Sequence, residues 1–311
     1  KKLLEKNVDT IRIFSRNESD QIKMENAFNN SKLRFLLGDI RDKERLVRAT
    51  EDIDIVFHAA ALKHVPKIEY NPFEAIKTNV VGSQNVIDAC LTNNVKKAIC
   101  VGTDKAVSPL NTYGATKLLM EKLFVTANNY LDPKKHTTKF IALRYGNVVG
   151  SSGSVIPKFI EQLKQKKELT ITDPHMTRFS ITMDEALDFI LTASELGKGS
   201  EIFIPKLRAY SILDVKNALQ DMIGNFGEKN IGIRPGEKLH ETLINKEEIR
   251  YSWEYKNLYI IIPPHYSTFH PNGINEFYQN IKKLDGMEEY SSDVVPNIPI
   301  NELKNIFKNL I

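Results

Sequence analysis

The sequence predicts an α/β fold: a Rossmann-like parallel sheet with helices on both faces, followed by a smaller C-terminal region. In the first half of the 311-residue chain, short apolar runs alternate with helical segments, as in repeated βαβ units. The apolar runs are too short for amphipathic helices and read as buried strands. After residue 150, glycine, serine and proline punctuate a mixture of helices and short strands. We therefore expect one domain over residues 1–150 and a second region over 151–311, which crosses back to the sheet in places.

The expected elements follow from apolar runs for strands and from apolar residues at helical spacing for helices. In 72–91, for example, Ile76, Val80 and Ile87 can face the sheet together. Strands are expected at 10–14, 33–37, 53–57, 98–102, 140–144 and 201–204. Helices are expected at 43–50, 72–91, 113–130, 183–196, 211–223 and 301–310. Residues 231–238 read as a charged strand and turn.

The beginning of the chain departs from this pattern. A dinucleotide-binding fold opens with a strand, a glycine-rich turn and a helix. Here residues 1–7 read as the last turns of a helix, and the sequence contains no such glycine-rich turn. We expect the numbering to start partway through the first βαβ unit, so that the first strand and its turn are missing. The alternative is a chain that has lost its pyrophosphate-binding turn.

Composition restricts the partners and the compartment. The net charge is +4 and the basic residues are scattered, which does not favour nucleic acid. Cys90 and Cys100 lie in apolar segments and read as buried thiols, so we expect neither disulfides nor a metal site. No apolar run reaches the roughly 18–20 residues that span a bilayer, and no signal peptide is present. These features predict a cytoplasmic protein without a membrane partner.

Tyr113 and Lys117 form the first candidate catalytic pair. They are four residues apart, so a helix places both side chains on one face. An ammonium beside a phenol lowers the phenol's pKa from about 10, and such a tyrosine can take a proton from a hydroxyl. The same spacing also occurs in many helices that have no catalytic role.

Thr103, Asp104 and Lys105 directly follow the strand expected at 98–102. Open α/β sheets place their sites at the carboxyl ends of the strands. Asp104 and Lys105 can serve there as an acid and a base, although such a pair is usually a solvated turn. A lysine base must be neutral, and we expect burial and the charge of Lys117 to lower the pKa of Lys105.

Several motifs along the chain resemble one enzyme family. They occupy residues 38–42, 58–66, 78–79, 103–106, 113–117, 144–151, 176–179 and 234–241. Together they resemble the extended short-chain dehydrogenase/reductases, and within these the inverting UDP-N-acetylglucosamine 4,6-dehydratases of the pseudaminic acid route. The Thr-Asp-Lys run is the most specific motif, because glucose-type 4,6-dehydratases carry Asp-Glu there. Many membrane-anchored relatives carry methionine at the position of Tyr113.

The resemblance implies an NADP cofactor that stays bound and is regenerated in each turnover. Independently, Arg16 at the end of the second strand suits a 2′-phosphate and so favours NADP over NAD. The implied cofactor-binding residues are Ser15, Arg16, Asp39, Ile40, Ala59, Ala60, Ala61, Lys63, Asn79, Tyr113, Lys117 and Val148.

The resemblance also implies a UDP-sugar substrate and a role for each catalytic residue. Tyr113, assisted by Lys117, takes the C4 hydroxyl proton, and Thr103 hydrogen-bonds the C4 oxygen. Lys105 removes the C5 proton, and Asp104 protonates the departing C6 hydroxyl. The implied substrate-binding residues are Lys63, Thr103, Asn147, Ser152, Thr177, Arg178, Arg234 and Glu237.

Other functions stay open on the sequence. One alternative is a retaining 4,6-dehydratase or a 4-epimerase of a nucleotide sugar. Asp104 and Lys105 argue against the epimerase, which needs no acid–base pair for water loss. A second alternative is a non-catalytic NADP-binding scaffold; the missing glycine turn favours it, and the intact Tyr113–Lys117 pair argues against it. The resemblance further implies a homo-oligomer.

Overall fold

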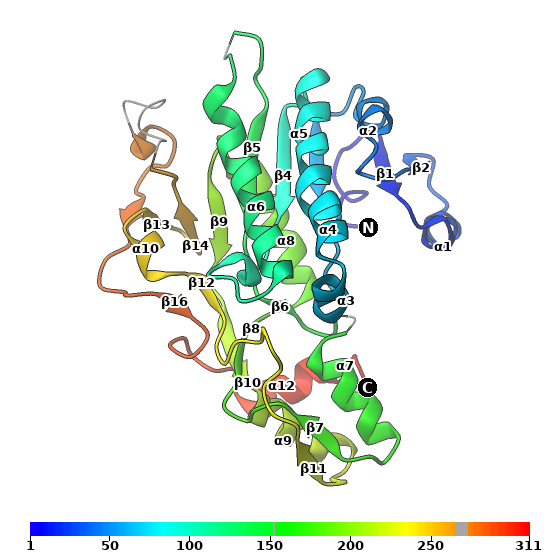
Figure 1. Ribbon diagram of the computed structural model, residues 1–311, viewed down its shortest axis with the longest axis vertical. Coiled ribbons are helices and arrows are strands. Elements are labelled where there is room, and N and C mark those ends of the chain that lie inside the picture. Colours follow the sequence, from blue (N-terminus) through cyan, green and yellow to red (C-terminus); the bar gives the residue numbers. More distant parts are fainter. Residues whose placement is uncertain (133, 152, 265–272) are drawn as a thin grey trace.

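A seven-stranded sheet forms the centre of the molecule (Figure 1). The computed structural model describes residues 1–132, 134–151, 153–264 and 273–311. The strand order is β15-β13-β14-β9-β5-β4-β3, in which β3, β4, β5 and β9 are parallel and the remainder antiparallel. The bounds are β3 Ile55–His58, β4 Lys97–Val101, β5 Lys139–Leu143, β9 Ile202–Pro205, β13 Ser252–Tyr255, β14 Leu258–Ile261 and β15 Lys282–Lys283.

Helices cover both faces of this sheet. Helices α5 (Gly82–Thr92) and α6 (Thr112–Thr126) lie on one face, and α8 (Met183–Leu196) lies on the other (Figure 1). Successive residues of a strand point to opposite faces. Accordingly, Phe140 packs in the same cluster as Phe124 of α6, and the next residue, Ile141, packs in the cluster of Phe189 of α8.

The first two strands form a separate parallel sheet. Strand β1 (Ile11–Ser15) pairs with β2 (Leu33–Leu37), flanked by α1 (Glu18–Phe28) and α2 (Lys43–Ala49). Within the described ranges, neither β1 nor β2 pairs with β3. The parallel strands of the first half are therefore divided between two sheets.

The second half of the chain builds a lower lobe and also returns to the central sheet through β9, β13, β14 and β15 (Figure 1). Its small sheets have the orders β10-β8-β6, β11-β7 and β12-β16. The strands are β6 Asn147–Val148, β7 Leu169–Ile171, β8 Thr177–Ile181, β10 Arg208–Ser211, β11 Glu228–Asn230, β12 Thr242–Ile244 and β16 Tyr290–Ser291. Helices α7 (Val155–Lys164), α9 (Ile212–Ile223) and α12 (Ile300–Phe307) share one apolar core. Short helices are α3 (Val65–Tyr70) and α10 (Lys246–Ile249).

Most of the predicted strands and helices occur within a few residues of their expected positions. The predicted helix 72–91 is a run of α4 (Pro72–Ala75), a π-helical segment (Ile76–Val81) and α5. Two predictions are wrong. Residues 1–7 make only short i→i+3 bonds, such as Leu4 N to Lys1 O, and are turns. Residues 231–238 contain no strand, because Pro235 and Gly236 form a tight turn.

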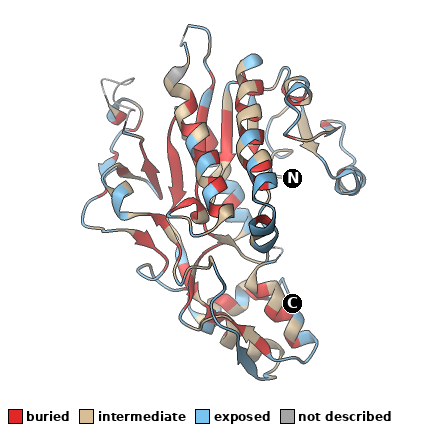
Figure 2. Ribbon diagram, viewed as in Figure 1, coloured by how far each residue is buried: buried red, intermediate tan, exposed pale blue. Residues whose placement is uncertain are grey.

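A buried ion-pair cluster joins the two halves of the chain. Arg144, at the end of β5, is 0% exposed. Its guanidinium contacts Glu121 of α6 at 2.6 Å and Glu248 of α10 at 2.7 Å, and it donates to the carbonyl of Leu243 at 3.0 Å. Figure 2 shows buried residues along the central strands. The cluster therefore anchors the segment around β12 to the helix that carries Tyr113.

None of the helices in the described ranges has both the length and the apolar character that a membrane crossing needs.

Candidate active site

The site begins where β4 ends. After Val101 and Gly102, the chain forms a single 3₁₀ turn, Asp104–Ala106, capped by Thr103. The Thr103 hydroxyl donates to Asp104 Oδ1 at 2.8 Å. The Asp104 side chain is fully buried, and its Oδ2 has no hydrogen-bond partner among the described residues. A buried acceptor without a donor is costly, so this oxygen is available to a ligand hydroxyl.

Helix α6 brings Tyr113 and Lys117 to the same place. Its N-cap is Asn111, whose side chain accepts from Gly114 N at 2.8 Å. A Cβ on Gly114 would lie 2.4 Å from the carbonyl oxygen of Lys105. Glycine at 114 therefore allows the 3₁₀ turn to pack against the first turn of α6. Thr103 lies close enough to the Tyr113 hydroxyl to favour the phenolate form of Tyr113.

The ammonium of Lys105 lies at the centre of the site. Its Nζ is 2.9 Å from Asp104 Oδ1, 3.0 Å from Asn147 Oδ1 of β6 and 3.3 Å from Glu241 Oε1. Asp104 and Asn147 accept two of the three N–H donors of Lys105, and Glu241 forms an ion pair with its ammonium. Asn147 thus contacts a predicted catalytic residue. Glu241 was not predicted as a site residue.

The pKa of Lys105 differs from the sequence-based expectation. Burial disfavours the charged ammonium, but Asp104 and Glu241 outweigh this and raise its pKa above the ordinary value. Lys117 is not among the charges that mainly set the pKa of Lys105, and its own Nζ donates to Val101 O at 2.9 Å. The expected lowering is therefore wrong. Burial raises the pKa of Asp104, and the charge of Glu241 adds to this against the opposing effect of Lys105.

The pKa of Tyr113 is also raised, chiefly by burial, with Lys105 as the main opposing charge. The expectation that Lys117 lowers this pKa is not met, because Lys117 is not among the charges that act on the phenol. Burial lowers the pKa of Lys117 itself. Val101 O and Met120 Sδ accept from Lys117, which leaves one of its three N–H donors for a ligand hydroxyl.

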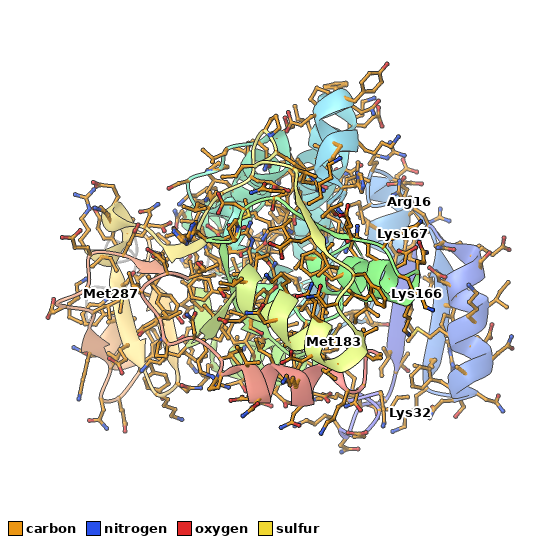
Figure 3. All side chains as sticks on the ribbon, turned by 90° about the horizontal axis from the view of Figure 1, so that it is seen from below. Arg16, Lys32, Lys166, Lys167, Met183 and Met287 are labelled. Atoms are coloured by element: carbon orange, nitrogen blue, oxygen red, sulfur yellow. The ribbon has the colours of Figure 1, made fainter. Side chains whose placement is uncertain are left out.

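The predicted adenosine-side residues lie at the ends of β1 and β2. Arg16 Nη1 is 3.5 Å from Asp39 Oδ2, which Arg41 also contacts at 2.7 Å. Burial opposes the charge of Asp39, but Arg41 and then Arg16 lower its pKa. Arg16 lies at the outer edge of this region (Figure 3). Ser15 accepts from Gln21 at 3.1 Å, and Ile40 is buried.

The loop after β3 supplies the next predicted cofactor contacts. Ala59 and Ala60 are exposed, Ala61 is half-buried and Lys63 is exposed. Asn79 is fully buried, and its amide bonds both the N–H and the carbonyl of Leu62 at 2.7 and 3.0 Å. Asn79 therefore holds the loop in place. The three alanines at 59–61 could line a nicotinamide dinucleotide here. They are small and at least partly exposed, which fits such a cofactor.

The predicted substrate-binding residues fall into separate groups. The Thr177 hydroxyl bonds His240 Nδ1 at 2.8 Å and the Ser292 hydroxyl at 2.7 Å, so it is occupied within the protein. Arg178 Nε is 3.7 Å from Glu241 Oε1. Val148, which was predicted to bind the cofactor, pairs with Ile181 of β8. Ser152 lies outside the described residues.

The segment 231–241, here called the 231–241 loop, carries two further predicted substrate-binding residues, Arg234 and Glu237. Arg234 to Glu237 forms a turn closed by a 3.0 Å bond from Glu237 N to Arg234 O, with Gly236 at φ +79°. Proline followed by glycine at positive φ is typical of a type II turn. Asn111 donates to Gly236 O at 2.9 Å, so the N-cap of α6 also holds the loop.

Three residues near the site were missed from the sequence: Lys158, Tyr210 and Glu241. Lys158 of α7 lies close enough to Arg234 that burial and this charge lower its pKa. Tyr210 of β10 is buried, and its phenol lies near Asn147 and Lys105. No motif in the sequence includes Lys158 or Tyr210. Glu241 belongs to the motif at 234–241, but the resemblance gave it no role.

Comparisons with known proteins agree with this geometry. The family described as polysaccharide biosynthesis protein matches residues 1–263. A UDP-N-acetylglucosamine 4,6-dehydratase (inverting) from Campylobacter jejuni is 49% identical over 290 residues, which cover 91% of this chain and 84% of that protein. A UDP-glucose 4-epimerase from Rickettsia bellii is 42% identical over 309 residues, covering 98% and 88%.

Two solved structures extend the comparison. Pen from Bacillus thuringiensis has a TM-score of 0.90 and 37% identity, covering 99% of this chain and 92% of that one. A dTDP-glucose 4,6-dehydratase from Streptomyces venezuelae, solved with NAD, has a TM-score of 0.67 and 20% identity, covering 74% and 77%. The matches confirm the predicted fold class, the family resemblance and the enzyme class.

Proposed function

Because this chain belongs to the polysaccharide biosynthesis protein family, we propose that it is a UDP-N-acetylglucosamine 4,6-dehydratase that inverts C5. The observation that carries the proposal is the Asp104–Lys105 pair, whose atoms lie 2.9 Å apart beside Tyr113 at the end of β4. Water loss across C5–C6 needs both an acid and a base. The Campylobacter relative supports the choice of substrate and of stereochemistry.

The reaction oxidises the sugar at C4, eliminates water and reduces C6. Tyr113 takes the C4 hydroxyl proton, Thr103 hydrogen-bonds the C4 oxygen, and Lys105 removes the C5 proton. Asp104 gives a proton to the C6 hydroxyl, which leaves as water. A proton then returns to C5 from the opposite face. Tyr113 and Lys105 gain one proton each, and Asp104 and a proton donor on the opposite face of C5 give up one each, so the sum is the loss of one water.

The ion pair must first exchange a proton. Lys105 is an ammonium in the resting site, and Asp104 Oδ1 lies 2.9 Å from its Nζ. Transfer of one proton along this contact gives a neutral amine and a protonated carboxyl, the two forms that the elimination needs. The raised pKa of buried Asp104 favours this transfer, and the raised pKa of Lys105 opposes it.

A nicotinamide cofactor, when bound, accepts the C4 hydride and returns it to C6. Lys117 has an N–H donor for the nicotinamide ribose, and Ala59, Ala60 and Ala61 allow close passage of the dinucleotide. Lys63, Asn79 and Val148 are the other residues that we assign to the cofactor, and Asn79 also holds the loop through Leu62. At the other end, Ser15, Asp39 and Ile40 would face the adenosine. The choice of NADP over NAD rests on Arg16, which is half-exposed and can reach a 2′-phosphate.

The UDP group would bind beside the 231–241 loop. Lys158 and Arg234 are two cations that share one region, where Glu237 is 3.5 Å from Arg234. A diphosphate between the two cations would relieve their repulsion, and an Arg fork suits phosphate oxygens. Glu237 is then available to the ribose hydroxyls. Arg178, Asn147 and Lys63 would line the sugar side, and Thr177 would act through His240.

The test is incubation of the protein with NADP and UDP-N-acetylglucosamine, followed by mass spectrometry and NMR. We expect a product lighter by one water, with a 4-keto group, a C6 methyl and inverted C5, without added reductant. Lys105→Ala should abolish the product while NADP remains bound. Product from this variant at the wild-type rate would reject the assignment of the base.

A 4-epimerase is the second candidate, favoured by the Rickettsia relative. Its product would have the mass of the substrate and differ only at C4. The same incubation separates the two functions, because only the dehydratase loses water. A cytoplasmic location and self-association stay predictions.

A further inference from the structure

Glu241 has a place in the site that the reaction described above does not use. Its side chain is buried, and Oε1 lies 3.3 Å from Lys105 Nζ and 3.7 Å from Arg178 Nε. Its backbone is fixed on both sides: Glu241 N donates to the Ser292 hydroxyl at 2.9 Å, and Ser292 N donates to Glu241 O at 2.8 Å. The carboxylate is thus aimed at Lys105 by a rigid main chain.

The second oxygen of this carboxylate, Oε2, is buried without a hydrogen-bond partner among the described residues. A carboxylate kept only for folding would be expected to use both oxygens, since an unsatisfied buried acceptor is costly. The same holds for Asp104 Oδ2. Two carboxylates therefore flank one ammonium, and each keeps one oxygen open.

The charges around Lys105 come from several elements. The carboxylates of Asp104 and Glu241 attract the ammonium, and the cations Arg178 and Lys238 oppose it; Lys238 is held by Val107 O. Two phenols also face it, Tyr113 and Tyr210. Among these groups, Glu241 is the carboxylate with no assigned role in proton transfer.

Resting on the proposed function, we propose that Glu241 is a positioning residue that holds the Lys105 ammonium against Asp104 and sets the pH range in which this pair is active. In the active forms, Lys105 and Asp104 share one transferable proton, which lies on either side chain. The two groups therefore titrate as a unit. Negative charge at 241 makes it harder for Asp104 to lose its proton and for Lys105 to lose its own. The charge of Glu241 therefore moves both limbs of the pH–rate profile upward.

The test is the pH profile of kcat/KM for Glu241→Gln, measured by product formation. We expect both limbs to move to lower pH, by about 1–3 units, the usual effect of one nearby charge. Glu241→Asp keeps the charge and should restore limbs near those of the wild type. Glu237→Gln is the matched control: it removes a carboxylate from the same loop, and should raise KM but leave both limbs in place.

The outcomes separate the two claims. If the wild type forms no dehydrated product at any pH, the proposed function fails. If the wild type is active and the Glu241→Gln profile superimposes on it, the inference about Glu241 is overturned. Should Glu241→Gln fold poorly by circular dichroism, the pH profile of Glu241→Asp decides. Limbs near those of the wild type support the inference, and limbs moved to lower pH by about 1–3 units overturn it.

Discussion

Replacing Arg144 with methionine should destabilise the protein more than any other single change at an ion pair. The substitution keeps similar volume but removes the guanidinium between Glu121 and Glu248, which lies 2.6 and 2.7 Å from them. Glu121 is 0% exposed, so its charge is left buried without a partner. Removing one partner of a buried ion pair costs about 3–5 kcal/mol. With an unfolding entropy near 2.1 cal/mol/K per residue, this lowers Tm by roughly 5–8 °C.

The assay is thermal unfolding followed by circular dichroism, with Arg208→Met as the matched control. Arg208 also pairs bidentately with a glutamate, Glu302, but both side chains are more than 40% exposed. Exposed pairs contribute little, so the control should leave Tm nearly unchanged. Equal Tm values for the two variants would refute the view that the buried cluster anchors the segment around β12 to helix α6.

The pH dependence of this cluster has a definite sign. Burial opposes the charge of Glu248, but Arg144 lowers its pKa below the ordinary 4.5. A carboxyl whose folded pKa is lowered stabilises the protein above its unfolded pKa. That stabilisation is lost as the pH falls through the folded pKa, and Arg144→Met should remove this part of the acid sensitivity.

Three further predictions concern the site. Tyr113→Phe removes the proton acceptor and should lower kcat by about 10²–10⁴-fold with NADP still bound, as measured by product formation and cofactor fluorescence. Gly114→Ala places a Cβ 2.4 Å from Lys105 O. It should therefore cost about 1–3 kcal/mol by denaturant unfolding and also lower kcat; an unchanged stability would contradict the close packing. Arg16→Ala should weaken NADP by roughly 10–100-fold and NAD hardly at all in equilibrium titrations. Equal weakening of both would argue against a 2′-phosphate contact.

The local part of the site could be predicted from the sequence because its residues are close in the chain. Thr103, Asp104 and Lys105 follow a recognisable buried strand, and Tyr113 opens the next helix. Helix 183–196 was predicted at its observed bounds, and the structure shows that it starts at a local signal, the capping box of Thr182 and Glu185.

The long-range part could not be predicted. The pKa of Lys105 was assigned the wrong direction because Glu241, one of its two carboxylate partners, arrives from a distant loop. Thr177 was predicted to bind substrate, but its hydroxyl bonds His240 and Ser292, which lie far away in the sequence. Asn79, which the resemblance assigns to the cofactor, also holds Leu62, a contact that no spacing rule indicates.

The central claim is that Lys105 and Asp104 eliminate water after oxidation beside Tyr113. The most direct measurement is a single turnover of Lys105→Ala with UDP-N-acetylglucosamine, following the absorbance of reduced nicotinamide together with product mass. The account predicts that the reduced nicotinamide accumulates, because oxidation at C4 proceeds, while no dehydrated sugar forms. Dehydrated sugar at the wild-type rate, with no accumulation of the reduced form, would contradict it.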